Sequence, residues 1–158
     1  MKINEFDKDF DVRFIDLNAG NHLSNHLLLG YITDYIAVYL AKHGWNYGDV
    51  YGHRILFSQI LLQLKREVFQ SDLVKISVDN VEIKSRKLIL SFVAKVEDKV
   101  VATTTHEINF LKDNRVVRIN EDIEELFSAL FNFLWVRFRA FCSPVNPASI
   151  SGITTLLL

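Results

Sequence analysis

A long run of largely apolar residues, 26–42, is the feature that most limits how this chain can fold. Its spacing predicts a helix, and Gly44 follows as a C-terminal stop. Large apolar side chains occur on nearly every side of that helix, and only Thr33 and Asp34 interrupt them in the middle. A helix that is apolar almost all round is buried on most of its surface. The rest of the chain must therefore wrap this helix.

Alternating apolar and polar residues later in the chain predict the sheet that covers the helix. The segments 74–78, 88–96 and 100–110 each place apolar residues at every second position. The polar stretches 84–87 and 97–99 between them are typical of turns that join antiparallel strands. We therefore predict an α+β domain in which one antiparallel sheet wraps one central helix.

Two segments near this core carry weaker patterns. Residues 10–16 alternate well enough to form a first strand. Residues 55–68 fit helix spacing and strand spacing about equally, so periodicity alone leaves both alternatives open.

A second helix is predicted near the C-terminus. Asn120 is placed to cap it, acidic residues follow at its start, and basic residues occur towards its end, which matches the helix dipole. We expect one domain over residues 1–120, and a C-terminal helix and tail over residues 121–158 packed on the same domain.

Composition excludes several functional classes. The 158 residues carry a net charge of −1, which gives no case for binding nucleic acid. The single cysteine, Cys142, rules out an internal disulfide and cysteine-cluster metal sites, and it suits a reducing compartment. Residues 1–9 are acidic and lack the apolar core of a signal peptide. We expect a cytoplasmic protein with no metal site.

A polar segment, 16–25, directly precedes the predicted central helix and gathers groups suited to carbonyl chemistry. It reads Asp-Leu-Asn-Ala-Gly-Asn-His-Leu-Ser-Asn. Backbone N–H groups in the first turn of a helix are unpaired and carry partial positive charge, so they stabilise a developing oxyanion. The side chains of the segment supply donors and acceptors for an attacking group. Ser24 or Asn25 is also placed to cap the helix.

The order of a strand, this motif, a buried helix and an antiparallel meander resembles the hotdog-fold thioesterases, the 4-hydroxybenzoyl-CoA thioesterase-like superfamily. The common motif there is Asp-x-Asp-x-x-Gly-His-Val-Asn-Asn, and without gaps it aligns with Asp16, His22 and Asn25 at its first Asp, its His and its last Asn. The form Asp-x-Asn-x-Gly-Asn-His-Leu is similar to a subgroup of bacterial thioesterase-like proteins. The resemblance covers roughly residues 8–118 and implies that 55–68 form a strand.

The chain departs from the family motif at its second Asp, usually regarded as the nucleophile or general base, which is Asn18 here. An amide has no accessible basic form, so Asn18 is expected only to orient a water or the acyl group. The resemblance leaves Asp16, His22 and Asp34 as candidate bases, with Asp34 falling where the superfamily often has a helix carboxylate. Asn25 is either a helix cap or a substrate contact, and Asp16 either fixes the turn or takes part in catalysis.

The resemblance implies hydrolysis of an acyl-CoA or acyl-carrier-protein thioester by water attack at the start of the central helix. CoA enters as part of the substrate, and no separate cofactor is expected. Hotdog sites form between subunits, so a homodimer or homotetramer is implied. Hotdog proteins tend to bind CoA near the hairpin that corresponds to Lys84, Ser85, Arg86 and Lys87, and these residues are the candidate contacts for its phosphates. A solvated hairpin tip is the alternative for them.

Three further alternatives follow from single features. The missing acid at Asn18 fits a non-catalytic hotdog protein that binds acyl-CoA or a protein partner. His106, on a strand face, is expected to be a core or interface histidine rather than a catalyst. The aromatic-rich segment 126–141 is expected to pack against the sheet or a partner subunit, and contact with a membrane surface is the lesser option.

Overall fold

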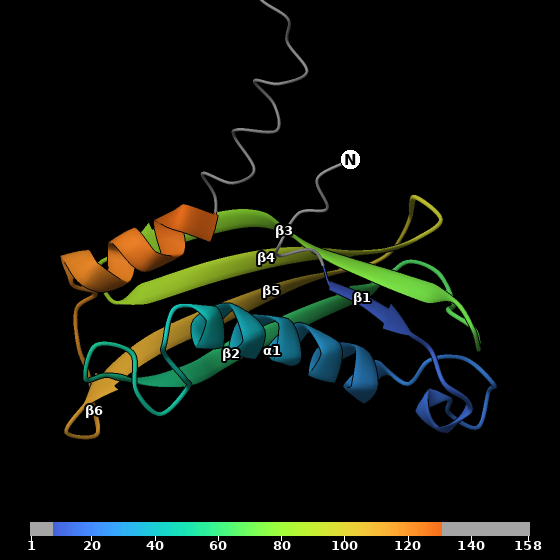
Figure 1. Cartoon of the computed structure of the whole chain (residues 1–158), viewed down its shortest axis with the longest axis horizontal. Coiled ribbons are helices and arrows are strands. Elements are labelled where there is room, and N and C mark those ends of the chain that lie inside the picture. The colour runs from blue at the N-terminus through green and yellow to red at the C-terminus, as the bar shows by residue number, and fades with distance from the viewer. Residues whose placement is uncertain (1–7, 131–158) are drawn as a thin grey trace, which may run out of the picture.

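The computed structural model describes residues 8–130, which form an antiparallel sheet with a long helix across one face (Figure 1). The strands are β1 (Lys8–Asp11), β2 (Arg54–Leu64), β3 (Leu73–Lys84), β4 (Lys87–Val96), β5 (Lys99–Lys112) and β6 (Arg115–Val116). The 3-10 helix η1 (Phe14–Asp16) precedes the long helix α1 (Asn25–Lys42). Residues 121–130 are also helical.

The sheet has the strand order β1-β3-β4-β5-β2, and β6 pairs with the end of β5. The three central strands are the antiparallel meander that the alternating pattern predicts. The ambiguous segment 55–68 is a strand as far as Leu64, paired with β5. Register shifts interrupt the β2–β5, β3–β4 and β4–β5 pairings, and such irregularities bend a sheet and increase its twist.

Helix α1 is buried against the concave face of this sheet (Figure 1). Its inward side chains follow helical spacing and meet the inward residues of the strands, which alternate with outward ones. Each buried large apolar side chain contributes about 2 kcal/mol relative to leaving it in water. The buried residues of α1 are Leu28, Ile32, Tyr35, Ile36, Tyr39 and Leu40.

The helical residues 121–130 close the core at the C-terminal end of α1 (Figure 1). The predicted cap is confirmed, because the Asn120 side chain accepts the backbone N–H of Ile123 at 3.0 Å. The Tyr39 hydroxyl donates to the carbonyl of Leu126, and the Phe127 ring lies 6.0 Å from that of Tyr39. Residues 131–158, including Cys142 and most of the aromatic-rich segment, lie outside the described residues, so the two-part division of the chain stays a prediction.

The predicted first strand over residues 10–16 is wrong for every residue after Asp11. Strand β1 ends at Asp11, and the chain then turns into η1. The reason is local, because the Asp16 carboxylate accepts the backbone N–H of Arg13 at 2.8 Å and so offers it a partner outside the sheet. Phe14, which continues the alternating apolar positions 10 and 12, and its apolar neighbour Ile15 are therefore left largely exposed.

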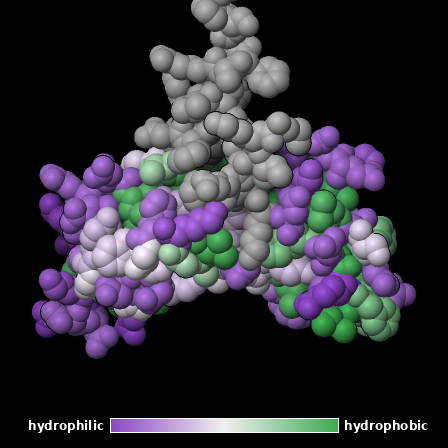
Figure 2. Space-filling view, in the orientation of Figure 1, coloured by the Kyte–Doolittle hydropathy of each residue, from purple (hydrophilic) through white to green (hydrophobic). Residues whose placement is uncertain are grey.

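Strand β2 lies at one edge of the sheet and presents apolar side chains that the protomer does not cover. On its helix-facing side Ile60 is 41% exposed and Leu64 is 51% exposed, and on the outer side Leu56 and Leu61 are exposed as well. Apolar surface is scattered among polar residues over the face that Figure 2 shows. Within residues 8–130 no helix is long and apolar enough to cross a membrane.

His106 lies at the centre of the core, one of the two places that its position on a strand face predicts. Its side chain has no exposed surface, and neither ring nitrogen has a hydrogen-bond partner. The rings of Phe57 and Phe92 meet it edge to face, at centroid distances of 5.8 and 5.5 Å. Because burial disfavours the charged imidazolium, the pKa of His106 is lowered to about 4.

We expect His106 to make the folded state less stable in mild acid. The pKa of an unfolded histidine is about 6.5. Between pH 6.5 and 4 the histidine is therefore protonated in the unfolded chain but stays neutral in the folded protein. Stability is therefore lost as the pH falls through this range, by on the order of 3 kcal/mol in total. The variant His106→Leu should lose this dependence, as urea midpoints at pH 7 and pH 5 would measure. Exposed His26→Gln is the control, and an unchanged pH dependence in His106→Leu would contradict the expectation.

Candidate active site

The polar segment 16–25 forms a tight loop that is fastened at both ends before α1 begins. The backbone N–H of Leu23 donates to the carbonyl of Val68 at 2.7 Å, and that of Ser24 donates to the carbonyl of Asp16 at 3.0 Å. Within the loop, Asn18 N–H donates to the carbonyl of His22 at 2.9 Å. Asn21 has a positive φ of 59°, which asparagine tolerates better than most residues. The loop therefore has a defined shape even though much of it is exposed.

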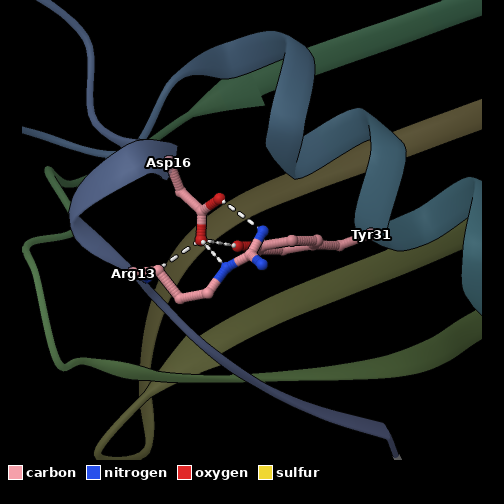
Figure 3. A network of polar contacts seen from close by, with 3 residues as sticks. All are labelled: Arg13, Asp16 and Tyr31. Atoms are coloured by element: carbon pink, nitrogen blue, oxygen red, sulfur yellow. Dashed lines mark hydrogen bonds and ion pairs between the residues drawn. The ribbon is translucent and has the colours of Figure 1, made fainter.

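Asp16 is enclosed by donors rather than open to a substrate (Figure 3). Its side chain is 1% exposed, and it accepts the Arg13 guanidinium through Nε at 3.1 Å and Nη2 at 2.9 Å. The same carboxylate accepts the Arg13 backbone N–H at 2.8 Å and the Tyr31 hydroxyl at 2.9 Å. Asp16 thus joins η1 to the second turn of α1.

The donors around Asp16 favour its charged form. The hydrogen bonds from Arg13 are the largest cause, with a further contribution from Tyr31, and together they lower the pKa of Asp16 to about 2. In return, burial and the contact with Asp16 raise the pKa of Tyr31 to about 12. A carboxylate with so low a pKa and so many partners is a poor proton acceptor near neutral pH. The geometry therefore favours the turn-fixing alternative for Asp16.

The first turn of α1 is left uncapped by side chains. Ser24 occupies the N-cap position, but its side chain makes no cap hydrogen bond, and its hydroxyl instead pairs with Nδ1 of His26 at 2.9 Å. Asn25 is the first residue of the helix itself rather than its cap. The helix start therefore keeps the partial positive charge of its N–H groups available.

A cleft of about 320 Å³ opens beside this helix start. Two of the predicted site residues, His22 and Asn25, lie in its wall, and Asn18 stands behind His22 with its Nδ2 3.1 Å from His22 Nδ1. The other wall is the stretch that leaves β2, and the floor is apolar. The full lining is His22, Leu23, Asn25, Leu28, Leu64, Lys65, Arg66, Glu67, Val68 and Val101.

Lys65 and Arg66 are lining residues that the sequence analysis missed. Their backbone N–H groups both donate to the carbonyl of Val101, at 2.8 and 3.1 Å, which holds this stretch beside the start of β5. Both side chains are exposed. The sequence feature that could have indicated them is a pair of adjacent cations at the end of an apolar strand. No short-range pattern links this pair with His22, which lies more than 40 residues earlier.

The structure places the other predicted site residues away from this cleft. Asp34 is exposed on α1, nine residues after Asn25, which is roughly 13 Å along the helix axis. The hairpin 84–87 lies towards the opposite end of β4 from the cleft, a separation of roughly 25 Å along the strand. There Lys84 pairs with Glu82 at 3.2 Å, and Lys87 pairs with Glu107 at 2.5 Å.

Comparison by sequence finds no match, either among family models or among curated proteins. Comparison by structure finds several thioesterases. A Thermus thermophilus thioesterase complexed with coenzyme A and Zn is 20% identical with a TM-score of 0.69, over 80% of this chain and 94% of that one. The Escherichia coli protein YbaW, named a probable thioesterase, is 19% identical with a TM-score of 0.69, over 78% and 97%. A gentisyl-coenzyme A thioesterase is 17% identical with a TM-score of 0.67, over 77% and 98%.

The fold is of the hotdog type. The curled antiparallel sheet, the helix on its face and the likeness to these thioesterases agree on this point, as the sequence resemblance implied. At such low identity the likeness concerns the fold alone, and the roles of the loop residues rest on their own geometry. Within residues 8–130 no group of three or more His, Cys, Asp or Glu side chains is placed to hold a metal ion.

We expect the hydrogen bonds to Asp16 to stabilise the folded protein at neutral pH. This stabilisation should be lost in acid. The folded pKa of about 2 lies below the value of about 3.9 for an unfolded Asp, so this stabilisation is present above pH 4 and is lost as the pH falls through 2. Asp16→Asn should lower the melting temperature at pH 7 by about 5 °C and should flatten its dependence on pH below 4. Calorimetry from pH 2 to pH 7 measures both effects. Exposed Asp79→Asn is the matched control, and equal melting temperatures for Asp16→Asn and wild type would contradict the expectation.

Proposed function

We propose that this protein hydrolyses acyl-CoA thioesters at the cleft beside the start of α1. The observation that carries the proposal is the cleft itself, where an uncapped helix start, an imidazole and an amide meet over an apolar floor. A thioester needs these features, because the carbonyl oxygen gains charge during attack while the acyl chain avoids water. The fold that the protein shares with thioesterases supports the same conclusion.

The proposed reaction is an addition of water followed by loss of the thiol. The carbonyl oxygen of the substrate accepts hydrogen bonds at the first turn of α1, where the helix dipole stabilises the tetrahedral oxyanion. Water forms the new C–O bond and gives its proton to a base, and the C–S bond then breaks. The leaving thiolate takes up a proton, so the products are a carboxylic acid and free CoA.

Asp16, the one acidic residue of the loop, is not the base in this scheme. The partners of Asp16 leave its carboxylate occupied, and Asn18 has no basic form. Of the three bases that the sequence resemblance suggested, His22 and Asp34 remain. Asp34 lies too far along α1 to act in the cleft of its own protomer, but it is exposed on the same side of the helix as Gly30 and Val38. We propose that it acts in the cleft of a second copy.

A second copy also accounts for the uncovered edge of the sheet. The exposed apolar side chains of β2 lie on both of its faces, and an unpaired edge strand of this length favours pairing with another strand. The cleft lies at the end of β2, so a copy paired there would contribute to its wall. We propose a homodimer formed through β2, and a homotetramer would be two such dimers.

We propose that Lys65 and Arg66 contact the phosphates of CoA at the rim of the cleft. Phosphate recognition needs positive charge and N–H donors, and both side chains are exposed where the substrate would enter. One structural neighbour holds coenzyme A. The hairpin 84–87 reaches a cleft only if it belongs to another copy, because within the protomer it lies at the far end of the sheet. An acyl-carrier protein is the alternative carrier.

A second function is favoured by one observation. The residue where the family motif has its acid is Asn18, and the one carboxylate of the loop 16–25, Asp16, is occupied by Arg13 and Tyr31. A protein with the cleft but without a base would bind acyl-CoA and not turn it over. Tight binding without release of thiol would establish this function, and efficient turnover would eliminate it.

We expect purified protein to release thiol from acyl-CoA substrates of some chain length. A panel from short to long acyl chains, followed with a thiol reagent, measures kcat and KM. His22→Ala should lower kcat by about 100-fold or more, since positioned proton donors and acceptors contribute at least that much. His43→Gln, at the opposite end of α1, is the matched control. Absence of turnover across the panel, or turnover indifferent to His22→Ala, would contradict the proposal.

We expect Ile60→Glu to separate the two copies and to abolish turnover while the protomer stays folded. The new carboxylate lies on the exposed helix-facing side of β2 and resists burial between two protomers. Sedimentation measures the molar mass, and circular dichroism reports the fold. Val116→Glu, on β6, is the control for an added charge at an exposed apolar position. A dimeric, active Ile60→Glu variant would exclude the proposed interface.

Mixing inactive variants tests whether Asp34 acts across the dimer. If His22 and Asp34 of each site come from different chains, dimers that combine one His22→Ala chain with one Asp34→Ala chain retain one intact site. An equal mixture should then recover about one quarter of wild-type activity, because half the dimers are mixed and each has one good site. A mixture that stays inactive would place both residues of a site on one chain.

A further inference from the structure

The side chain of Asn18 is the centre of a small hydrogen-bond network in the loop before α1. Its Oδ1 accepts the backbone N–H of Gly20 at 2.8 Å, and its Nδ2 lies 3.1 Å from Nδ1 of His22. Its backbone N–H donates to the carbonyl of His22 at 2.9 Å, and its own carbonyl accepts the N–H of Asn21 at 3.0 Å. Asn18 is therefore hydrogen-bonded directly to Gly20, Asn21 and His22.

These contacts determine which way the Asn18 amide points. A backbone N–H only donates, so the atom facing Gly20 must be the acceptor, Oδ1. The NH₂ group then faces the His22 ring. An NH₂ group only donates, so Nδ1 of His22 must accept, and the proton of the neutral imidazole must be on Nε2.

Gly20 provides the space for this arrangement. A Cβ atom at position 20 would lie 2.9 Å from Nε2 of His22, 3.0 Å from Cδ2 of the same ring, and 3.1 Å from Oδ1 of Asn18. The distance to Nε2 is shorter than Cβ contacts in proteins and the other two are tight, so a side chain here would displace the ring or disturb the Asn18 contact. The absence of a side chain lets the imidazole lie against the turn.

We infer that Asn18 is a positioning residue that holds His22 as the Nε2–H tautomer. His22 lines the cleft, and its other ring nitrogen, Nε2, is then a hydrogen-bond donor rather than a proton acceptor. In the proposed thioester hydrolysis, on which this consequence rests, the Nε2–H donates to the carbonyl oxygen as the C–O bond forms, and it stays on the ring. The proton of the attacking water goes to a different group.

The isosteric change Asn18→Asp reverses this assignment. A carboxylate still accepts the N–H of Gly20, but toward the ring it offers only an acceptor. The neutral ring must then carry its proton on Nδ1, which leaves the lone pair of Nε2 free. Replacing the NH₂ group of residue 18 with an oxygen thus converts Nε2 of His22 from a donor to an acceptor, and the side chain keeps its shape.

The tautomer is measured directly in the full-length protein by ¹⁵N NMR with ¹⁵N-labelled histidine, above the pH at which the ring is charged. Protonated and unprotonated ring nitrogens differ widely in ¹⁵N shift, and His22→Gln identifies the His22 signals. We expect Nε2–H in the wild type, Nδ1–H in Asn18→Asp, and a mixture in Asn18→Ala. A wild type with its proton on Nδ1, or a tautomer that both variants leave unchanged, would overturn the inference.

A second turn in the same chain supplies the matched control. Asn46 Oδ1 accepts the N–H of Gly48 at 2.8 Å, as Asn18 does with Gly20, but its partners do not include a histidine ring. Asn46→Asp should leave the His22 spectrum unchanged. Gly20→Ala should keep the fold and shift the His22 signals, because the new methyl group displaces the ring.

Turnover measurements separate this inference from the proposed function. With an active substrate, Asn18→Ala should lower kcat by about two- to fivefold, in proportion to the fraction of His22 that loses its Nε2–H, and leave KM within about twofold, since a lost oxyanion donor acts on the transition state. A purely structural role would instead lower stability and leave kcat unchanged. If no acyl-CoA is hydrolysed, the proposed function fails, while the NMR result still decides whether Asn18 sets the tautomer.

Discussion

Burial of α1 against the curled sheet is the constraint on which the rest of the structure depends. Six side chains of the helix are buried, and at about 2 kcal/mol each they make this contact the main favourable contribution of the helix to the fold. The C-terminal end of the helix is closed by residues 121–130, and its N-terminal end lies beside the stretch that leaves β2. The cleft and its helix dipole are therefore consequences of how the core packs.

The loop before α1 divides its polar residues between holding the structure and facing the cleft. Asp16 is ion-paired with Arg13, accepts a hydrogen bond from the Tyr31 hydroxyl, and joins η1 to α1. Asn18 is hydrogen-bonded to Gly20 and to the His22 ring, and His22 and Asn25 are the residues of the loop motif with polar side chains that line the cleft. This arrangement explains why a motif with one acid and three amides supplies few groups able to accept a proton.

Local patterns predicted most of the fold but only part of the lining of the candidate site. The meander of β3, β4 and β5 was predictable because alternation along a strand reports directly which side is buried. The same reasoning failed at 10–16, where one carboxylate captured a backbone N–H and turned the chain. His22 and Asn25 were found because they are close together in sequence, whereas Lys65 and Arg66 reach the cleft only through the pairing of β2 with β5.

The sequence by itself determined that an apolar helix is wrapped by an antiparallel sheet, and that a polar loop opens the helix. Both follow from the periodicity of the apolar residues and from interactions between residues that are close together in the sequence. Only the tertiary structure decided which polar groups are occupied, where the cleft opens, and why Asp34 and the hairpin 84–87 are remote from it. Those properties depend on distances between residues far apart in the chain, and such distances are set by packing.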